Sequence, residues 1–312
     1  FNGNASARFN ILEGLSFTVQ AGYNYDHSPS YSFSSSKVNA SATSSMSNSS
    51  SLHRYWQNTN NLSYSGEFAG HSISANAIWE MSQTISSSMS LSGSKLNNES
   101  VGYWNVSNAS VRSNSNSYSE TSLMSGVVRV NYDYNKRYFL TAAFRADGSS
   151  KFQQDHRWGM FPSMALAWDV AKENFIKDIS FIEQFKIRVS YGETGNEAIS
   201  AYSTLGMLSS TSYGWGTSTD YTGYWGNTFS TPDLSWEKTK QFDMGFDISL
   251  KGVDVSVDWF KKNTEDLLFQ KQVPRYNGGG TYWVNQGKLC NKGFELSVNT
   301  FPIDNIVTWE TT

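Results

Sequence analysis

The sequence has little of what marks several common classes of protein. Its single cysteine, Cys290, cannot form an internal disulfide, and there are only 5 prolines in 312 residues. No stretch approaches the ~18 consecutive apolar residues of a transmembrane helix. That absence leaves room for a transmembrane β-barrel, whose strands alternate over only about ten residues. The net charge of −3 lacks the basic excess typical of proteins that bind nucleic acid.

Catalytic and metal-binding motifs are missing as well. The sequence has no HExxH, CxxC or GxSxG motif, and "GETGN" at 192–196 lacks the GK[ST] of a phosphate-binding loop. We interpret Asp147, in "RADGSS", as a turn residue rather than a calcium ligand. We therefore expect no enzyme, metal site or cofactor. The four histidines are scattered along the chain: His27, His53, His71 and His156.

One segment shows two opposite faces. In "KQFDMGFDISLKGVDVSVDWFKKN" (240–263), apolar and polar residues alternate on both sides of Lys251-Gly252, which predicts a tight hairpin. With Leu250 opposite Val253, the apolar side chains from Phe242 to Trp259 fall on one face, and a one-residue slip would reverse this. We expect lipid on that face and a polar lumen on the other, where Asp247→Arg should be tolerated. The polar face carries four aspartates, interpreted as a solvated wall rather than a cation site: Asp243, Asp247, Asp254 and Asp258.

The same period recurs throughout the chain and predicts about twelve strands. Aromatic residues gather near the ends of their apolar faces, as in the aromatic girdles of membrane barrels. Short and long connections alternate, which is typical of an up-and-down transmembrane barrel with all its tight turns at one end. A soluble Greek-key sandwich mixes loop lengths at both ends. The long connections, expected on the extracellular side, are 28–51, 84–118, 147–157, 194–235 and 266–284, while 171–180 is expected to be a short helical turn on the opposite side.

Several motifs taken together resemble one family. They begin with "RYFLTAAFRADGSSKFQQDHRWGMFPSMALAWDV" (137–170) and "FKIRVSYGETGN" (185–196). They continue through "LSWEKTKQFDMGFDISL" (234–250) and "DVSVDWFKKNTEDLLF" (254–269), and end with "VNQGKLCNKGFELSVNTFPI" (284–303). This sequence resembles the SusC/RagA-type TonB-linked outer-membrane transporters, well over about 120–310 and loosely before that.

The resemblance implies a fold and partners. It implies an all-β fold, an antiparallel up-and-down transmembrane barrel of roughly 22 strands, of which this chain supplies about twelve in one domain spanning 1–312. It also implies a plug domain and a TonB-binding segment, neither of which has a counterpart in this sequence. We therefore expect a fragment of a longer polypeptide. The implied partners are a SusD-type surface lipoprotein, the TonB energy complex (through a part outside this chain), outer-membrane lipid, and an oligosaccharide or peptide cargo.

Exposed aromatic residues on a long loop are the best candidates for a binding site. The segment 212–227 contains five of them, spaced by Gly, Ser and Thr, so we expect neither a strand nor a helix face there. Two interpretations stay open: stacking on cargo, or contact with a capping lipoprotein or a neighbouring loop. The candidate residues are Tyr213, Trp215, Tyr221, Tyr224 and Trp225, with Trp104 as a weaker one.

The predicted function is TonB-dependent import of an oligosaccharide or peptide across the bacterial outer membrane. One alternative is an outer-membrane barrel that serves adhesion or secretion without transport. Another is a secreted carbohydrate-binding β module, which should be soluble without detergent.

The alternation of connections predicts an orientation. Epitope tags inserted at Ser45 and Lys251 should behave differently in intact cells, because Ser45 lies in a long connection and Lys251 in a tight turn. We expect antibody to label the Ser45 tag on intact cells and the Lys251 tag only after permeabilisation. Surface labelling of Lys251 without Ser45 would reverse the assigned orientation.

Overall fold

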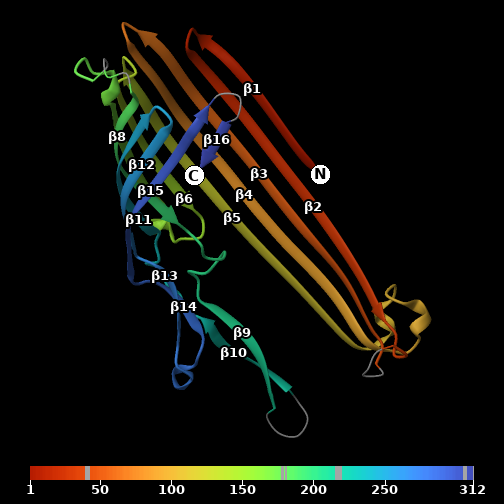
Figure 1. Ribbon diagram of the computed structural model, residues 1–312. Helices are drawn as coiled ribbons and strands as arrows, with labels where there is room; N and C mark the ends of the chain where they lie inside the picture. The colour runs from red at the N-terminus through yellow and green to blue at the C-terminus, as the bar shows by residue number, and fades with distance from the viewer. Residues whose placement is uncertain (39–42, 177–178, 180, 215–219, 305–307, 312) are drawn as a thin grey trace. The chain divides into compact units, whose positions relative to one another are not determined.

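The computed structural model describes residues 1–38, 43–176, 179, 181–214, 220–304 and 308–311. Strands joined by turns and short 3-10 helices make up this part of the chain (Figure 1). Among the described residues, no helix has the length and apolar character to cross a membrane.

Twelve strands form the main sheet, which confirms the predicted count, and neighbours in the sheet are neighbours in sequence except where two hairpins branch off. The main-sheet strands are β1 (Asn2–Leu12), β2 (Leu15–Ser34), β3 (Ser45–Phe68), β4 (His71–Leu96), β5 (Ala109–Tyr134), β6 (Tyr138–Ser149), β7 (Trp158–Asp169), β8 (Ile182–Asn196), β11 (Glu237–Leu250), β12 (Val253–Glu265), β15 (Lys288–Asp304) and β16 (Thr308–Thr311). A second sheet, in the order β13-β14-β10-β9, contains β9 (Met207–Gly214), β10 (Asp220–Thr228), β13 (Leu268–Gln272) and β14 (Thr281–Asn285).

The chain divides into two compact units. The first comprises Phe1–Ala7, Val19–Thr59 and Glu80–Leu123; the second comprises Arg8–Thr18, Asn60–Trp79 and Met124–Thr312.

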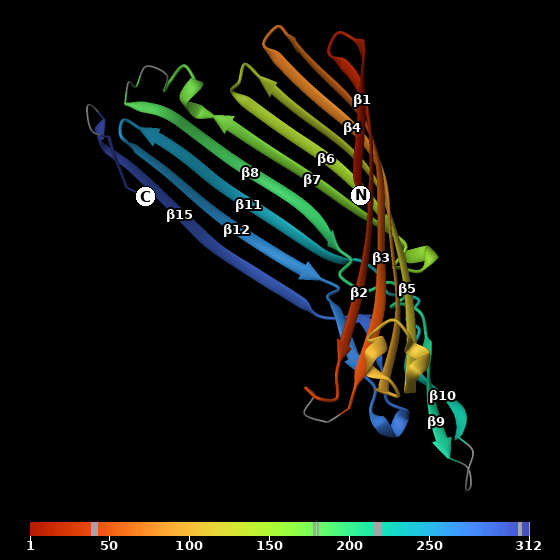
Figure 2. The same ribbon diagram turned by 90° about the vertical axis from the view of Figure 1, so that its right-hand side faces the viewer.

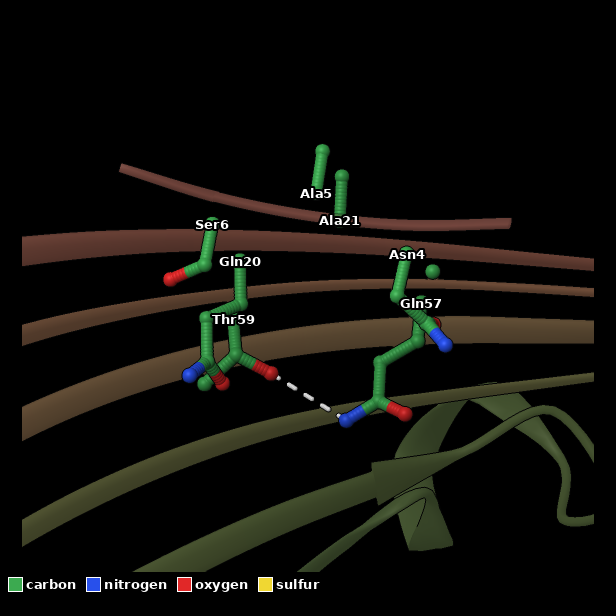
Figure 3. A pocket seen from close by; sticks show the side chains of 8 residues that line it. Asn4, Ala5, Ser6, Gln20, Ala21, Gln57 and Thr59 are labelled. Carbon is green, nitrogen blue, oxygen red and sulfur yellow. Dashed lines mark hydrogen bonds between the residues drawn. The ribbon is translucent and has the colours of Figure 1, made fainter.

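The first unit consists of long, serine-rich strand segments with two faces. Figure 3 shows Ala5 and Ala21 pointing to one side of the sheet, while Asn4 and Gln57 point to the other. The polar side lines a pocket of about 310 Å³, where the Gln57 amide donates to Thr59 Oγ1 at 3.1 Å. The alternation of faces therefore holds in these segments of β1, β2 and β3.

The predicted connections 28–51 and 84–118 are much shorter in the structure. β2 runs to Ser34 and β3 starts at Ser45, while only residues 97–108 separate β4 from β5. Polar residues predominate on both faces of these serine-rich strands and apolar residues are sparse, so the stretches lack the sustained apolar alternation that marks a strand in sequence. Cross-strand hydroxyl bonds support them instead, as between Ser88 and Ser117 at 2.8 Å.

The other long connections also contain more structure than predicted. The connection expected at 147–157 is limited to 150–157, around the 3-10 turn η3 (Gln154–His156). The segments 194–235 and 266–284 contain the four strands of the second sheet. Both Figures 1 and 2 show that sheet beyond the ends of β11 and β12. The expected helical turn at 171–180 corresponds to η4 (Val170–Lys172), continued by a 3-10-type bond from Ile176 N to Glu173 O.

The β11–β12 hairpin in the second unit has the register that the sequence predicts. Leu250 pairs with Val253 and Met244 with Trp259, with no irregularity between them. Gly252 has a φ of 79°, a left-handed conformation that glycine adopts without strain. The predicted pairing of this hairpin is confirmed.

The two faces of this part of the sheet differ in polarity. Phe246 on β11, Leu166 on β7 and Leu296 on β15 are exposed large apolar side chains on one face of the sheet, in which β8 lies between β7 and β11 and β12 lies between β11 and β15 (Figure 2). On the opposite face, Arg188 donates to both carboxylate oxygens of Asp247, at 2.8 and 2.9 Å, and to Asp258 at 3.1 Å. These contacts argue against the expectation that Asp247→Arg is tolerated, because the variant would place two guanidinium groups together and leave Arg188 without its main partner.

Substitutions on the two faces should have different effects on assembly. Phe246→Arg places a charge on the apolar face, which costs roughly 2–4 kcal/mol if that face lies against lipid near the bilayer midplane. Asp254→Arg changes a residue on the polar face of the same hairpin, so it serves as the control. We expect Phe246→Arg to reduce the folded, heat-modifiable band in outer-membrane fractions and Asp254→Arg to leave it intact. Equal folded amounts of the two variants would show that Phe246 does not face lipid.

Candidate binding hairpin and its anchor

The aromatic residues singled out at 212–227 lie on the β9–β10 hairpin of the second unit. β9 and β10 pair antiparallel, with Tyr213 opposite Tyr221 and Ser209 opposite Trp225. The two tyrosine ring centroids are 6.2 Å apart. The prediction that this segment forms neither strand nor helix is wrong, because cross-strand aromatic pairs and Thr residues support a strand despite the interspersed glycines.

The register sorts the candidates onto two faces. Tyr213, Tyr221 and Trp225 share one face, and Tyr224 points to the other, opposite Ser210. All four aromatic side chains are exposed, Tyr224 most of all at 70%. The fifth candidate, Trp215, lies outside the described residues.

A glycine allows the Tyr213 ring to lie close to the neighbouring backbone. Gly223 lies on the same face as Tyr213, between Tyr221 and Trp225, and a Cβ added there would be 2.9 Å from a Tyr213 ring carbon. The hairpin thus presents three aromatic rings on one face, interspersed with Ser and Thr. Such a surface can stack on flat apolar groups and form hydrogen bonds from its hydroxyls.

A buried aromatic cluster anchors the base of the segment that carries this hairpin. Phe152, Phe161 and Trp236 are 2%, 5% and 5% exposed. The Trp236 ring centroid lies 5.4 Å from that of Phe152 and 5.6 Å from that of Phe161, edge-on to the latter. Trp236 Nε1 donates to the Arg157 carbonyl at 2.8 Å, so its one polar atom is satisfied.

Two glycines make space for this cluster. A Cβ at Gly159 or at Gly195 would overlap the ring of Phe161. The cluster and its two glycines draw on "DGSSKF" and the nearby "RWGMFPS", on "GETGN" and on "LSWEKT", and these three parts of the chain meet in space although they are far apart in sequence. Sequence reasoning used these motifs only for the resemblance and missed their packing role. The sequence did contain a signal for this packing. Two glycines and several bulky aromatic residues occur in motifs whose apolar and polar residues otherwise alternate as in strands.

An amide and a carboxylate tie the base of the second sheet to the start of β11. The Asn285 side chain accepts from Ser235 N at 2.8 Å and donates to Ser235 O and Asp266 O, both at 2.9 Å. Glu237 accepts a hydrogen bond from the Leu268 backbone N–H at 3.0 Å. The backbone pairing of β11 with β12 ends at Lys238 and Glu265. Beyond that point, these side-chain hydrogen bonds hold the ends of β13 and β14.

The weaker candidate, Trp104, belongs to the first unit. It is 78% exposed and follows Tyr103, whose ring lies 4.8 Å from that of Trp104 and 5.4 Å from that of Tyr31. Nearby, Glu99 accepts hydrogen bonds from the Ser35 hydroxyl at 2.6 Å and from Ser36 N at 3.1 Å. The Ser35 hydroxyl, followed by the Ser36 contacts, lowers the pKa of Glu99 below its usual value. These contacts fix the 97–108 connection against the end of β2.

The described residues contain no group of three or more His, Cys, Asp or Glu side chains that could hold a metal ion. Among the aspartates of the polar face, Asp247 and Asp258 accept hydrogen bonds from Arg188, and Asp243 accepts one from the Ser190 hydroxyl at 3.2 Å. Asp147 lies inside β6 opposite Gly159 and pairs with Arg145 at 2.6 Å, so the interpretation of Asp147 as a turn residue is wrong.

The comparisons with known proteins agree with this architecture. The chain matches the family described as "TonB dependent receptor-like, beta-barrel" over residues 1–312. TonB-dependent receptor P3 of Formosa agariphila is 35% identical over the whole chain, which spans 32% of that receptor. The chain belongs to the TonB-dependent receptor family. The predicted all-β, up-and-down barrel fold is therefore confirmed.

Two other matches support the resemblance to SusC and RagA. TonB-dependent receptor SusC of Bacteroides thetaiotaomicron is 35% identical over 60% of this chain and 19% of its own length. The solved structure titled "Structure of the RagAB peptide transporter" has a TM-score of 0.87, with 22% identity, covering 97% of this chain and 34% of that one. The chain therefore spans about a third of the length of P3 and about a third of the matched RagAB chain. It shares the fold of that part of the RagAB chain.

The buried cluster predicts a local effect of substitution. Trp236→Ala should remove two ring contacts and a buried hydrogen bond, a loss of about 3–5 kcal/mol. We expect 197–236 to become sensitive to limited proteolysis in folded protein. Trp225→Ala, at an exposed position, is the control and should leave the cleavage pattern unchanged. Identical protection in the two variants would show that Trp236 does not anchor this segment.

Proposed function

We propose that this chain forms part of a TonB-dependent importer that takes up an oligosaccharide or a peptide across the bacterial outer membrane. Its family membership, over the whole chain, carries this proposal. Energy would come from a TonB complex that acts through a part of the protein outside this chain. The apolar face of the sheet would contact lipid, and the Arg188 network would face the interior.

The strand lengths support an extension on one side of the membrane. A transmembrane β-strand needs about 9–11 residues, whereas β3, β4 and β5 have 24, 26 and 26. The serine-rich ends of these strands are mostly polar on both faces, which suits water rather than lipid. We place those ends, together with the β9–β10 hairpin, on the cell surface, because the tight turns connect the strands at their other ends.

The exposed β9–β10 hairpin is the part best suited to contact cargo or a capping lipoprotein. One matched structure is titled a peptide transporter, and one relative is named SusC, so both cargo classes and a SusD-type partner remain within the proposal. The face with Tyr213, Tyr221 and Trp225 has the continuous aromatic surface that stacking requires. We therefore assign cargo contact to that face.

The two faces of the hairpin provide a matched test in the full-length protein. We expect Tyr213→Ala with Trp225→Ala to leave the amount of folded protein unchanged, because both side chains are exposed. Uptake of the cognate oligosaccharide or peptide should fall about ten-fold, as stacking contacts are lost at two rings. Growth on that cargo as sole carbon source, and binding of labelled cargo to cells, measure the effect.

Tyr224→Ala is the control because it removes an even more exposed ring from the opposite face. It should leave uptake near the wild-type level. A loss of lipoprotein co-purification in the double variant, with cargo binding to the isolated importer unchanged, would reassign this face to the partner. Unchanged uptake and complex formation in all variants would exclude the hairpin as a binding site.

A further inference from the structure

A basic patch lies on the apolar face of the second unit, directly beyond the last large apolar residues. Tyr191, Phe242 and Trp259 are among the last of these on β8, β11 and β12, and the Phe242 and Trp259 rings lie 5.9 Å apart, edge to face. Strand pairing continues without irregularity past this row, so the residues that follow at alternate positions point to the same side. Those residues include five lysines and two glutamates: Lys238, Lys240, Lys261, Lys288, Lys292, Glu193 and Glu265.

Two of these lysines face each other directly. Lys261 on β12 pairs with Lys292 on β15. Like charges at directly opposed positions of a sheet destabilise it, because their Cβ atoms are only about 5 Å apart. Neither ammonium group makes an ion pair within the described part of the chain, and both side chains are exposed.

The surroundings of Lys261 offer no carboxylate to offset this repulsion. Its other neighbour across the sheet is Phe242, and along its own strand the residues on the same face are Trp259 and Asn263. The nearest carboxylate on this face of β11–β12, that of Glu265, is already engaged by Lys240 at 3.0 Å and Lys288 at 3.6 Å. An anion from outside the chain is the remaining group that could bridge Lys261 and Lys292.

We infer that Lys261 and Lys292 bind the phosphate of a phosphorylated lipid headgroup in the leaflet on the side of the long connections. The patch is continuous with the apolar and aromatic surface, so a ligand whose acyl chains pack on Phe242 and Phe294 brings its headgroup to the lysines. The long alkyl stems of lysine suit this boundary, since they pack on apolar surface while the ammonium reaches the polar layer. This site goes beyond cargo import, although it rests on the proposed membrane placement.

The test uses the full-length protein in detergent and native mass spectrometry with two probes, diphosphoryl lipid A and its fully dephosphorylated form. We expect the wild-type protein to bind the phosphorylated probe on the order of ten-fold more tightly, and Lys261→Gln with Lys292→Gln to abolish this preference. Lys261→Arg with Lys292→Arg should retain it, because the charges remain. Lys262→Gln is the matched control, since Lys262 is the next residue along β12 and points to the opposite face.

Heat-modifiable mobility on gels reports the folding of every variant. If the double Gln variant does not fold, the two single Gln variants replace it. We expect each single variant to lose a part of the preference for the phosphorylated probe. Retention of the preference in both single variants or in the double variant would overturn the inference, as would an equal loss in Lys262→Gln. Competition by inorganic phosphate as effective as that of the lipid would assign the lysines to a free anion instead. Binding in detergent requires no transport, so failure of cargo uptake leaves this result unaffected.

Discussion

Backbone pairing in a fixed register is the constraint on which the rest of this structure depends. Adjacent strands must satisfy each other's N–H and C=O groups, and the side-chain period of exactly two residues then assigns every side chain to one face. From β8 through β11 and β12 to β15, this assignment is nearly free of irregularities. The apolar surface, the Arg188 network and the opposed lysines are all consequences of the same ladder.

The sequence predicted this register where the two faces differ strongly in polarity. In the β11–β12 hairpin, apolar residues alternate with polar ones or a glycine from Phe242 to Trp259, and Gly252 supplies the left-handed turn, so only one alignment places the apolar and the polar residues on separate faces. Elsewhere the same reasoning failed for a physical reason. The serine-rich ends of β2–β5 are mostly polar on both faces, so the strands there are specified by pairing with their neighbours rather than by a sustained apolar alternation visible in one strand.

The second sheet shows what single-strand patterns cannot supply. β9 and β10 alternate aromatic residues with Gly, Ser and Thr, and their pairing becomes evident only when Tyr213 is placed opposite Tyr221. The β10–β14 contact is a single parallel bridge between Thr228 and Thr281, segments separated by two strands of the main sheet. The Phe152–Phe161–Trp236 cluster is likewise assembled from three separate motifs. Sequence reasoning identified four of the exposed hairpin rings as candidates but not the faces they occupy.

Position in the ladder also explains why similar side chains play different roles. Trp236 and Trp225 lie on either side of the same connection, yet Trp236 is buried where Gly159 and Gly195 leave room for Phe161, while Trp225 is exposed beside Gly223. The same holds for cations: Arg188 points to the face that carries Asp247 and Asp258, whereas Lys261 points to a face where Phe242 and Lys292 flank it. Inserting one residue into β12 beyond the Lys251-Gly252 turn would therefore disrupt the apolar surface, the arginine network and the lysine pair together. These three features are not independent additions to the sheet, because a single register positions them all.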